Sequence, residues 1–491
     1  DEIFSIISME KMFYNCYSLT SLNLSTFYIN QYINASYMFY NCKQLKYIYF
    51  GDNNSFHLNS MEYMFYNCYN LNSLTIINFS FSKVESTKYM FYNCSRLDLL
   101  NVINNNADFH KVKDMSYMFY NCVRLTSLRF WSNYFWTEQV TNLDHMFTNC
   151  YKLKQFDLSK FYTLSVTNME SMFESCTNIT YLNVSLFATS GVTNMKNMFK
   201  SCSDLTSLVF NNIKFDTSNV INMEGMFSDC NKLSELNVNL KTQNVQNMNS
   251  MFKNCHSLSS IYMTDNFVTS SVTDMGQMFS GCYVLTSIYL SYFYTSRVTN
   301  MEKMFYNCHK ISFSSLNFNT QRVINMNSMF YNCYNLTTIN LAGFDTSQVT
   351  NMDHIFTNCE SLIELNLEKF DTSLIEDMNQ IFANCSSLKS LKVYNNFVTS
   401  RVTNMSQMFY NCNSLEILNL ISFATQNVRN MSQMFYNCEK LSTLQFNFYT
   451  QSVLNMSQMF YNCKSLSMLN LNNFNTRCVR DMQSMFYNCI L

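Results

Sequence analysis

Apolar residues recur along the chain at the spacings i, i+3, i+4 and i+7. Met301, Met304, Phe305 and Cys308 are one instance, and the set returns about every 26 residues over the whole chain. This spacing is typical of one face of about two helical turns. Asn300 stands directly before the set, and Ser, Asn or Asp holds this place in every copy. Such side chains accept hydrogen bonds from the first amides of a helix, so each segment is predicted to be a short capped helical turn.

Beyond each cysteine the pattern changes to Leu-x-x-Leu-x-Leu, as in Leu415, Leu418 and Leu420. Its last part alternates with a period of two, which indicates a short strand. A sequence period of 20–50 residues is typical of solenoids, whose units bury their apolar faces by stacking. We therefore predict an α/β repeat solenoid resembling leucine-rich repeats, with one short parallel strand and one capped helical turn in each of 19 repeats. Residues 1–491 are expected to form a single array without a linker. Because both ends lie within repeats, we expect the chain to be part of a longer protein.

The repeat can be written Val-Thr-Asn-Met-x-x-Met-Phe-x-x-Cys-x-x-Leu-x-x-Leu-x-Leu, closed by Phe-x-Thr-Ser, with clear copies at 192–208 and 402–420. This string resembles the repeat of BspA-like leucine-rich repeat surface proteins. Some early copies depart from it, because Ala35 and Thr87 replace the first Met. The resemblance implies a leucine-rich-repeat solenoid at the cell surface or outside the cell. It also implies a role in adhesion or surface coating without catalysis.

Composition and charge narrow the classes of partner. The formal net charge of the 491 residues is −1, from 32 basic and 33 acidic side chains that are scattered along the chain. Without a basic stripe, nucleic-acid binding is not expected. No apolar run approaches the roughly 18 residues that a membrane span needs, so none is predicted in this segment.

The cysteines are candidates for metal binding or cross-linking. None of the 20 forms a Cys-x-x-Cys pair and no histidine stands at metal-ligand spacing, so no metal or other cofactor is predicted. All but Cys478 share one inward position, where buried free thiols are favoured over a ladder of disulfides. Cys478 lies off this register and is predicted to be a free exposed thiol or a cross-link to another chain. No catalytic motif is present, and we expect no enzyme activity.

Two polar or aromatic patterns mark the expected surface. The middle residue of Leu-x-Leu is Asn in about half the copies, as in Asn23 and Asn419, which predicts either an Asn ladder between coils or a polar binding face. Tyrosine follows the recurrent Phe in many copies, and these residues form either a contact row or a cover over neighbouring coils. They are Tyr14, Tyr40, Tyr66, Tyr92, Tyr120, Tyr306, Tyr331, Tyr410, Tyr436, Tyr461 and Tyr487.

Two further sets of residues are candidate sites. Trp131, Tyr134 and Trp136 lie in one of the longest repeats, and insertions in solenoids often carry binding sites, so they are a candidate ligand site. Asn-x-Ser/Thr sequons are possible glycosylation sites if the source is a secreting eukaryote. They include Asn34, Asn53, Asn78, Asn178, Asn335, Asn404, Asn430 and Asn455.

Three functions therefore remain open. The first is a non-catalytic structural protein of the cell surface or exterior that assembles into filaments or a coat through its solenoid ends and tyrosine rows. The second is a surface adhesin that binds a host protein or a glycan. The third is a cytosolic protein-interaction scaffold, which reduced cysteines would suit. In each case the expected partner is a protein, either a second copy or a surface protein, with a glycan as the alternative.

Overall fold

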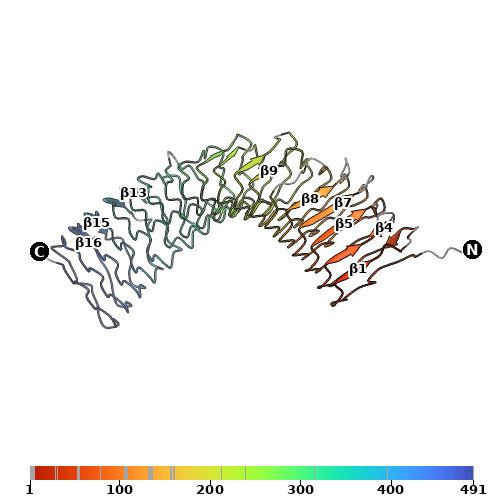
Figure 1. Cartoon of the computed structure of the whole chain (residues 1–491). Helices are drawn as coiled ribbons and strands as arrows, with labels where there is room; N and C mark the ends of the chain where they lie inside the picture. The colour runs from red at the N-terminus through yellow and green to blue at the C-terminus, as the bar shows by residue number, and fades with distance from the viewer. Residues whose placement is uncertain are drawn as a thin grey trace, which may run out of the picture. The chain divides into compact units, whose positions relative to one another are not determined.

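The computed structural model describes residues 6–27, 29, 31–51, 56–77, 79–103, 109–130, 137–154, 158, 161–211, 213–237, 239–313, 316–394 and 396–489. The chain divides into two compact units, Asp1–Val245 and Gln246–Leu491. Within each unit, successive coils of the chain lie side by side, as Figure 1 shows. The expectation of one uninterrupted array over residues 1–491 stays a prediction.

The strands are short and parallel. The first unit contains β1 (Ser21–Asn23), β2 (Ile33–Asn34), β3 (Tyr47–Tyr49), β4 (Phe56–Ser60), β5 (Ser73–Ile77), β6 (Phe79–Ser80), β7 (Leu99–Ile103), β8 (Ser127–Phe130), β9 (Tyr181–Asn183), β10 (Ser207–Val209) and β11 (Glu235–Asn237). Its sheets have the orders β1-β3, β2-β4-β6, β5-β7-β8 and β10-β9. The second unit contains β12 (Ser260–Tyr262), β13 (Glu364–Asn366), β14 (Ser390–Lys392), β15 (Ile417–Leu420) and β16 (Thr443–Phe446), with the pairs β13-β14 and β15-β16.

The strands predicted from Leu-x-Leu are confirmed where they form. In β15, Leu418 lies in register with Leu444 of β16, and both are buried because alternate strand residues point inward. The strand ladder is interrupted, however. Among the described residues between β12 and β13, Leu-x-Leu-like segments follow the same path without forming strands.

The predicted capped helical turn is wrong. No residue in the described part of the chain is helical. In the segment from Met301 to Cys308, the amides of Met304 and Cys308 donate to carbonyls three residues earlier, at 3.2 and 3.1 Å. The alternate amides cross to the next coil, as Lys303 N donates to Asn327 O at 2.8 Å and Phe305 N to Met329 O at 3.0 Å. A helix would instead send every amide to the fourth carbonyl before it.

Left-handed residues cause this backbone path. Lys303 has φ 53° and Asn307 has φ 58°, and the corresponding residues of the other coils share these values. A left-handed residue in the middle of the segment ends any helix there. The i, i+3, i+4, i+7 pattern is nevertheless satisfied, because Met301, Phe305 and Cys308 are all fully buried. Burial alone does not distinguish these successive turns from a helix.

The count of 19 repeats is not supported either, since the structure is a β-solenoid of about 15 turns. A count of cysteines treats every copy as a full coil, but several coils have no strand among their described residues. In addition, Cys16 and Cys489 in the first and last copies are only partly buried. The leucine-rich-repeat-like solenoid itself is retained, as a coil of turns and strands.

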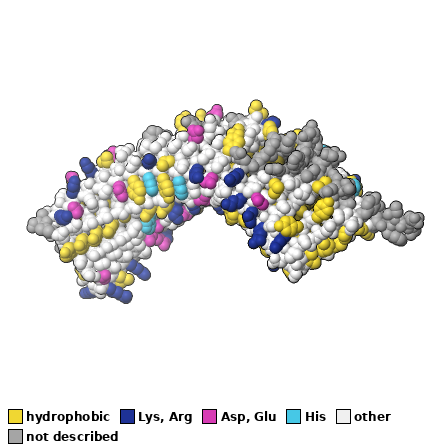
Figure 2. All heavy atoms as spheres, in the orientation of Figure 1, with side chains coloured by type: hydrophobic (Ala, Val, Ile, Leu, Met, Phe, Trp, Pro, Cys, Tyr) yellow, Lys and Arg dark blue, Asp and Glu magenta, His cyan; other side chains and the backbone are white. Residues whose placement is uncertain are grey.

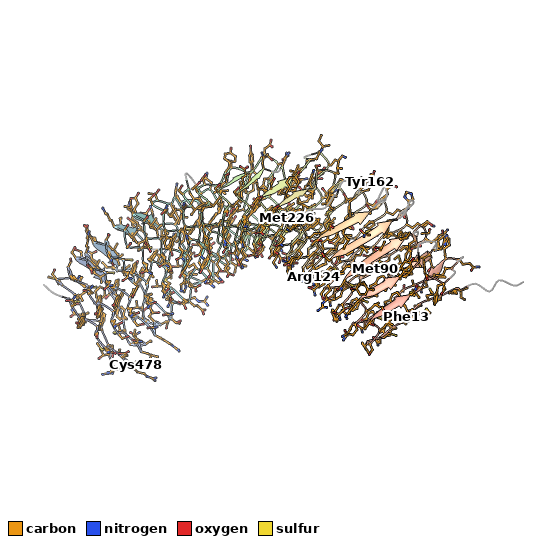
Figure 3. The ribbon with its side chains drawn as sticks, viewed as in Figure 1. Phe13, Met90, Arg124, Tyr162, Met226 and Cys478 are labelled. Carbon is orange, nitrogen blue, oxygen red and sulfur yellow. The ribbon has the colours of Figure 1, made fainter. Side chains whose placement is uncertain are left out.

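Identical side chains stack inside the coils. In the first unit, Phe39, Phe65 and Phe91 have parallel rings with centroids 5.2–5.3 Å apart. Met90 and Met226, labelled in Figure 3, hold the same inward repeat position directly before the recurrent Phe and are 2% and 0% exposed. Because each coil buries its apolar face on identical neighbours, the stack and not the single repeat is the stable unit.

Candidate functional surface

The predicted tyrosine row forms a stacked column in the first unit. The rings of Tyr14, Tyr40, Tyr66, Tyr92 and Tyr120 follow one another with centroids 4.7–4.9 Å apart and within 8° of parallel. Tyr14 is 41% exposed, and the other four are half-buried. The rings therefore cover neighbouring coils and also form a surface.

A second column, which the sequence analysis missed, runs beside the first. It contains Tyr37, Tyr63, Tyr89 and Tyr117, with centroids 4.7–4.8 Å apart, and ends on His145, 4.5 Å from Tyr117. The two columns are in contact, because the ring centroids of Tyr37 and Tyr40 are 5.7 Å apart and those of Tyr63 and Tyr66 are 5.6 Å apart. The signal was present as Tyr-Met-Phe-Tyr in four successive copies. We call the ten residues of both columns the tyrosine face.

Burial holds two phenols of the tyrosine face, those of Tyr63 and Tyr66, in the protonated form. Burial, followed by the neighbouring phenols, raises the pKa of Tyr66 to about 12, and burial with Tyr37 and Tyr89 raises the pKa of Tyr63 to about 12. At neutral pH, each hydroxyl can both donate and accept a hydrogen bond. The broad sides of the inner rings are covered by their neighbours, so a ligand meets ring edges and hydroxyls. Such a surface suits hydrogen bonds and edge contacts more than stacking on a single ring.

The second unit carries shorter columns at the same repeat position. Tyr306 stacks on Tyr331 at 4.8 Å. Tyr410, Tyr436, Tyr461 and Tyr487 form another column with spacings of 4.6–4.9 Å. All eleven predicted tyrosines thus belong to columns, and their role as contact rows stays a prediction.

Histidine alternates with tyrosine in one further column of the second unit. His256, Tyr283, His309 and Tyr334 follow one another with ring centroids 4.6–4.8 Å apart. Figure 2 shows histidine side chains alternating with hydrophobic ones along a row of the surface. Burial lowers the pKa of His309, which favours the neutral ring in this column.

The Asn ladder exists, but at another position than predicted. The middle asparagines of Leu-x-Leu cap local turns, as Asn23 Oδ1 accepts from Ser25 N at 2.9 Å and Asn419 Oδ1 from Ile421 N at 3.1 Å. The amide ladder is built from the asparagines directly before cysteine, where each Nδ2 donates to the Oδ1 of the preceding coil at 2.5–2.9 Å. In the second unit it runs through Asn307, Asn332, Asn358, Asn384, Asn411, Asn437, Asn462 and Asn488.

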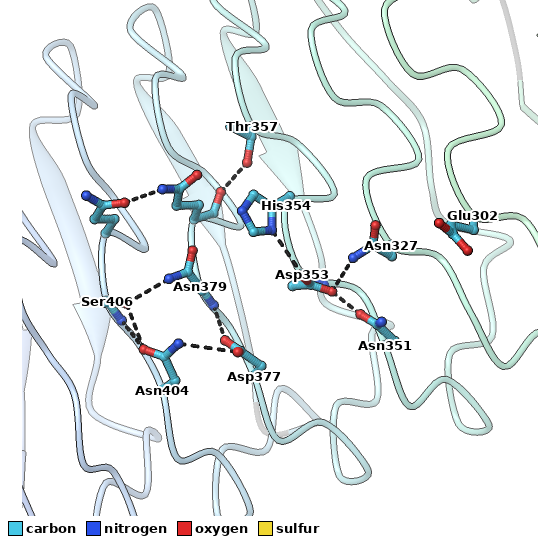
Figure 4. A network of polar contacts seen from close by, with 12 residues as sticks. Glu302, Asn327, Asn351, Asp353, His354, Thr357, Asp377, Asn379, Asn404 and Ser406 are labelled. Atoms are coloured by element: carbon cyan, nitrogen blue, oxygen red, sulfur yellow. Dashed lines mark hydrogen bonds and ion pairs between the residues drawn. The ribbon is translucent and has the colours of Figure 1, made fainter. Parts of the chain in front are cut away.

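The adjacent residues Asp353 and His354 belong to a similar network between coils. His354 Nδ1 lies 3.2 Å from Asp353 Oδ2, and Asn327 Nδ2 donates to Asp353 Oδ1 at 2.5 Å, as Figure 4 shows. Burial would raise the pKa of Asp353, but these hydrogen bonds outweigh it and lower the pKa below its ordinary value. On the next coils Asn379 Nδ2 donates to Ser406 Oγ at 2.8 Å. Because these groups hold one another, we interpret the network as structural.

The cysteines are free thiols in the described chain. In the repeat position the Sγ donates to the Phe carbonyl of the preceding coil, for example Cys385 to Phe356 O at 3.2 Å. Burial raises the pKa of Cys385 to about 12, so the thiol stays neutral. Cys478 is exposed, at an edge of the molecule in Figure 3, as predicted for a free thiol or a cross-link. Its cross-link role stays a prediction.

Other predicted sites are distributed as follows. Trp131, Tyr134, Trp136, Asn53 and Asn78 lie outside the described residues. Two of the remaining sequon asparagines donate hydrogen bonds from Nδ2 to a carboxylate of the preceding coil. Asn34 donates to Glu10 Oε2 at 3.0 Å, and Asn404 donates to Asp377 Oδ2 at 3.3 Å. Asn335 is exposed, and three others are half-buried: Asn178, Asn430 and Asn455. Glycosylation at these sites stays a prediction.

Two further kinds of site are absent from the described residues. There, no cluster of three or more His, Cys, Asp or Glu side chains has the arrangement that a metal ion needs. No helix in this part of the chain has the length and apolarity of a membrane span.

The sequence matches one family model repeatedly, described as Mycoplasma protein of unknown function, DUF285. The matches cover residues 7–131, 128–211, 177–289, 259–364, 283–394, 334–442 and 416–490. The chain belongs to this family. The resemblance of this DUF285 chain to BspA-like leucine-rich repeat surface proteins is confirmed as well. A comparison with curated proteins finds no match.

Three solved structures are similar to this DUF285 protein. A leucine-rich repeat protein from Bacteroides ovatus is 17% identical, with 84% of this chain and 82% of that chain covered and a TM-score of 0.41. A second, from Eubacterium ventriosum, is 17% identical over 75% and 84%, with a TM-score of 0.35. A leucine-rich cell surface protein from Faecalibacterium prausnitzii is 14% identical over 81% and 82%, with a TM-score of 0.27.

Proposed function

We propose that this chain is a non-catalytic cell-surface protein that binds another protein through its tyrosine face. The observation that carries the proposal is the pair of touching aromatic columns in the first unit, from Tyr14 to Tyr120 and from Tyr37 to His145. Tyrosine is enriched in the cores of protein interfaces, where its ring supplies apolar area and its hydroxyl supplies a hydrogen bond. The resemblance to BspA-like surface proteins supports a location at the cell surface or outside the cell.

The stacked geometry favours this function because it keeps the surface rigid. Each inner ring is held between two others, so little rotamer freedom is lost when a partner binds. The rings form a regular, mostly half-buried surface on consecutive coils, with hydroxyl groups along its length. A protein partner that spans several coils would use many weak contacts at once.

An adhesion assay tests the proposal with two matched variants of the whole chain. Tyr40→Ser, Tyr66→Ser and Tyr92→Ser together remove three rings, whereas the Phe substitutions at the same positions keep the stack and remove only the hydroxyls. We expect the Ser variant to lose at least tenfold in binding to cells or to an immobilised surface-protein fraction, and the Phe variant to lose less. Equal binding of the Ser variant and the wild type, with both folded by circular dichroism, would contradict the proposal.

Two alternatives, a ligand site in the long repeat and assembly into filaments, are tested by further experiments. The double variant Trp131→Ala and Trp136→Ala tests the predicted ligand site in the long repeat. If this variant loses binding and the Ser variant of the tyrosine face does not, the partner binds at the long repeat instead. Assembly into filaments is a separate prediction. Sedimentation velocity over a hundredfold range of concentration tests it, and a constant monomer would exclude self-assembly.

A further inference from the structure

The first unit has a hollow on its strand side. None of the residues that line this hollow belongs to the tyrosine face. It has a volume of about 320 Å³ and lies between β3 and β5, where it is lined by Tyr47, Ile48, Tyr49, Phe50, Gly51, Ser73, Thr75 and Ile77. The hollow coincides with a break in the strand ladder. β3 pairs with β1 and β5 pairs with β7, but β3 and β5 belong to different sheets although they are neighbours in the stack.

Two aromatic rings stand at this break. Tyr47 and Tyr49 are 56% and 47% exposed, whereas Ile48 between them is buried. Because they are two residues apart on one strand, both side chains project from the same face, about 6.6 Å apart along it. Pairing of Tyr47 with Ser21 and of Tyr49 with Asn23 holds β3 in place. The rings therefore form a short platform over the strand surface.

Small hydroxyl side chains lie alongside the platform. Ser73 and Thr75 are the exposed residues of β5, at the strand positions that follow Tyr47 and Tyr49 in the stack. Among the described residues, the lining contains no charged side chain. Aromatic rings beside Ser and Thr hydroxyls, without charge, complement a neutral ligand that has both apolar C–H faces and many hydroxyl groups. A sugar ring has this composition.

The size of the hollow supports the same ligand class. A stable protein interface covers roughly 800 Å² on each partner, much more than this hollow offers. Its volume of about 320 Å³ lies at the lower end of the range for small-molecule sites, which begins near 300 Å³. A short saccharide fits this range.

The same chemistry recurs in the second unit. A hollow of about 370 Å³ is lined by Ser287, Ile288, Tyr289, Leu290, Ser291, Phe293, Tyr294, Ser312, Phe313 and Asn317. Tyr289 and Tyr294 are 58% and 52% exposed, and again no charged residue lines it. It too lies where no strand ladder forms in the described chain. By contrast, a smaller hollow of about 180 Å³ beside β13 has Glu364 and Lys392 in its lining and no aromatic residue.

We propose that the hollow at Tyr47 and Tyr49 binds a neutral oligosaccharide, and that the hollow at Tyr289 and Tyr294 is a second site of the same kind. The Tyr rings pack on the C–H faces of the sugar, and the Ser and Thr hydroxyls exchange hydrogen bonds with its hydroxyl groups. Because neither lining carries charge, affinity depends little on ionic strength. The proposal is independent of the protein-binding role of the tyrosine face.

An array of neutral gluco-, manno-, galacto- and N-acetylhexosamine oligosaccharides, with sulfated and sialylated glycans as a charged comparison set, tests the proposal on the full chain and is followed by calorimetry with the best binder. We expect binding that changes less than twofold between 50 and 500 mM NaCl. Tyr47→Ala with Tyr49→Ala should remove one of two sites and lower the stoichiometry by one. Tyr47→Trp with Tyr49→Trp should retain the site, since it keeps flat rings.

Tyr181→Ala is the matched control. Tyr181 is 40% exposed and holds an outward position of β9, but β9 is paired with β10 and Tyr181 lines none of these hollows. This variant should bind like the wild type. The proposal is overturned if no neutral glycan binds, if only sulfated or sialylated glycans bind with strong salt dependence, or if Tyr181→Ala reduces binding as much as the Tyr47 and Tyr49 substitutions. Melting curves show whether each variant is folded.

Discussion

The side-chain amide of Asn437 donates to the amide oxygen of Asn411 across 2.8 Å, while both backbones are left-handed, with φ 57° and 58°. Asparagine serves two purposes here, because it tolerates this backbone and its amide links successive coils. The two contributions can be separated by substitution.

Asn411→Gly keeps the backbone permissible and removes only the amide, so we expect a loss of about 1–2 kcal/mol in the free energy of unfolding. Asn411→Ala removes the same amide and also places a β-carbon on a left-handed residue, which adds about 1 kcal/mol. Urea denaturation of both variants measures the difference. Equal stabilities would show that the backbone conformation contributes nothing.

The Thr of Phe-x-Thr links coils by a different route. Thr425 Oγ1 donates to Tyr449 O at 2.9 Å and accepts from Tyr449 N at 2.7 Å, and the side chain is fully buried. Thr425→Val has nearly the same shape but leaves both backbone groups without a partner, so we expect a loss of about 2–4 kcal/mol. Thr425→Ser retains the hydroxyl and should lose less than half as much. Thermal melting of the pair distinguishes lost hydrogen bonds from lost packing.

Thiol reactivity should divide the cysteines sharply. Cys478 is exposed, Cys16 and Cys489 are partly buried, and the remaining described cysteines are buried. A maleimide should therefore label Cys478 within minutes in native protein, label Cys16 and Cys489 more slowly, and reach the others only after denaturation. Peptide mass mapping identifies the labelled positions. Rapid native labelling of Cys385 would contradict the buried register.

Alkaline pH should destabilise the fold. Burial raises the pKa of the Cys202 and Cys385 thiols from 9.0 to about 12, and that of Tyr66 from 10.0 to about 12. Because the folded state binds these protons more tightly, its stability is fully present below pH 9 and is lost as the pH rises towards 12. Denaturation midpoints measured from pH 7 to 11 should fall steeply above pH 9. A flat profile would show that the groups are not protected by folding.

The inward positions could be predicted from the sequence, but the backbone path could not. Met301, Phe305 and Cys308 are buried as their spacing predicts. The left-handed residue at Lys303 leaves no signal, because Lys has no preference for that conformation and is held there by the amide bond to Asn327 O on the next coil. A backbone conformation that depends on hydrogen bonds to neighbouring coils cannot be predicted from the sequence of a single repeat.

The surface was predicted in part for a similar reason. The repeat period of the sequence was sufficient to predict the column from Tyr14 to Tyr120. The second column and the amide ladder before the cysteines could not be predicted in this way, because they depend on the direction in which each side chain points. The alternation of Asn23 with leucines predicts either a ladder or a polar binding face, but its amide oxygen accepts a hydrogen bond from Ser25 N within its own turn. The hollow at Tyr47 depends on where strand pairing fails, which no local pattern encodes.

The alternation of backbone hydrogen bonds also bears on how such a protein can change its length. Each coil donates the same set of backbone hydrogen bonds to the next coil. For example, Lys303 N donates to Asn327 O, and Ser328 N on that coil donates to Asp353 O on the following one. A recombination event that duplicates or deletes a whole number of coils would restore every one of these bonds at the new junction. An insertion of half a coil would leave them unmatched, so copy number in this family should vary between genomes in complete steps.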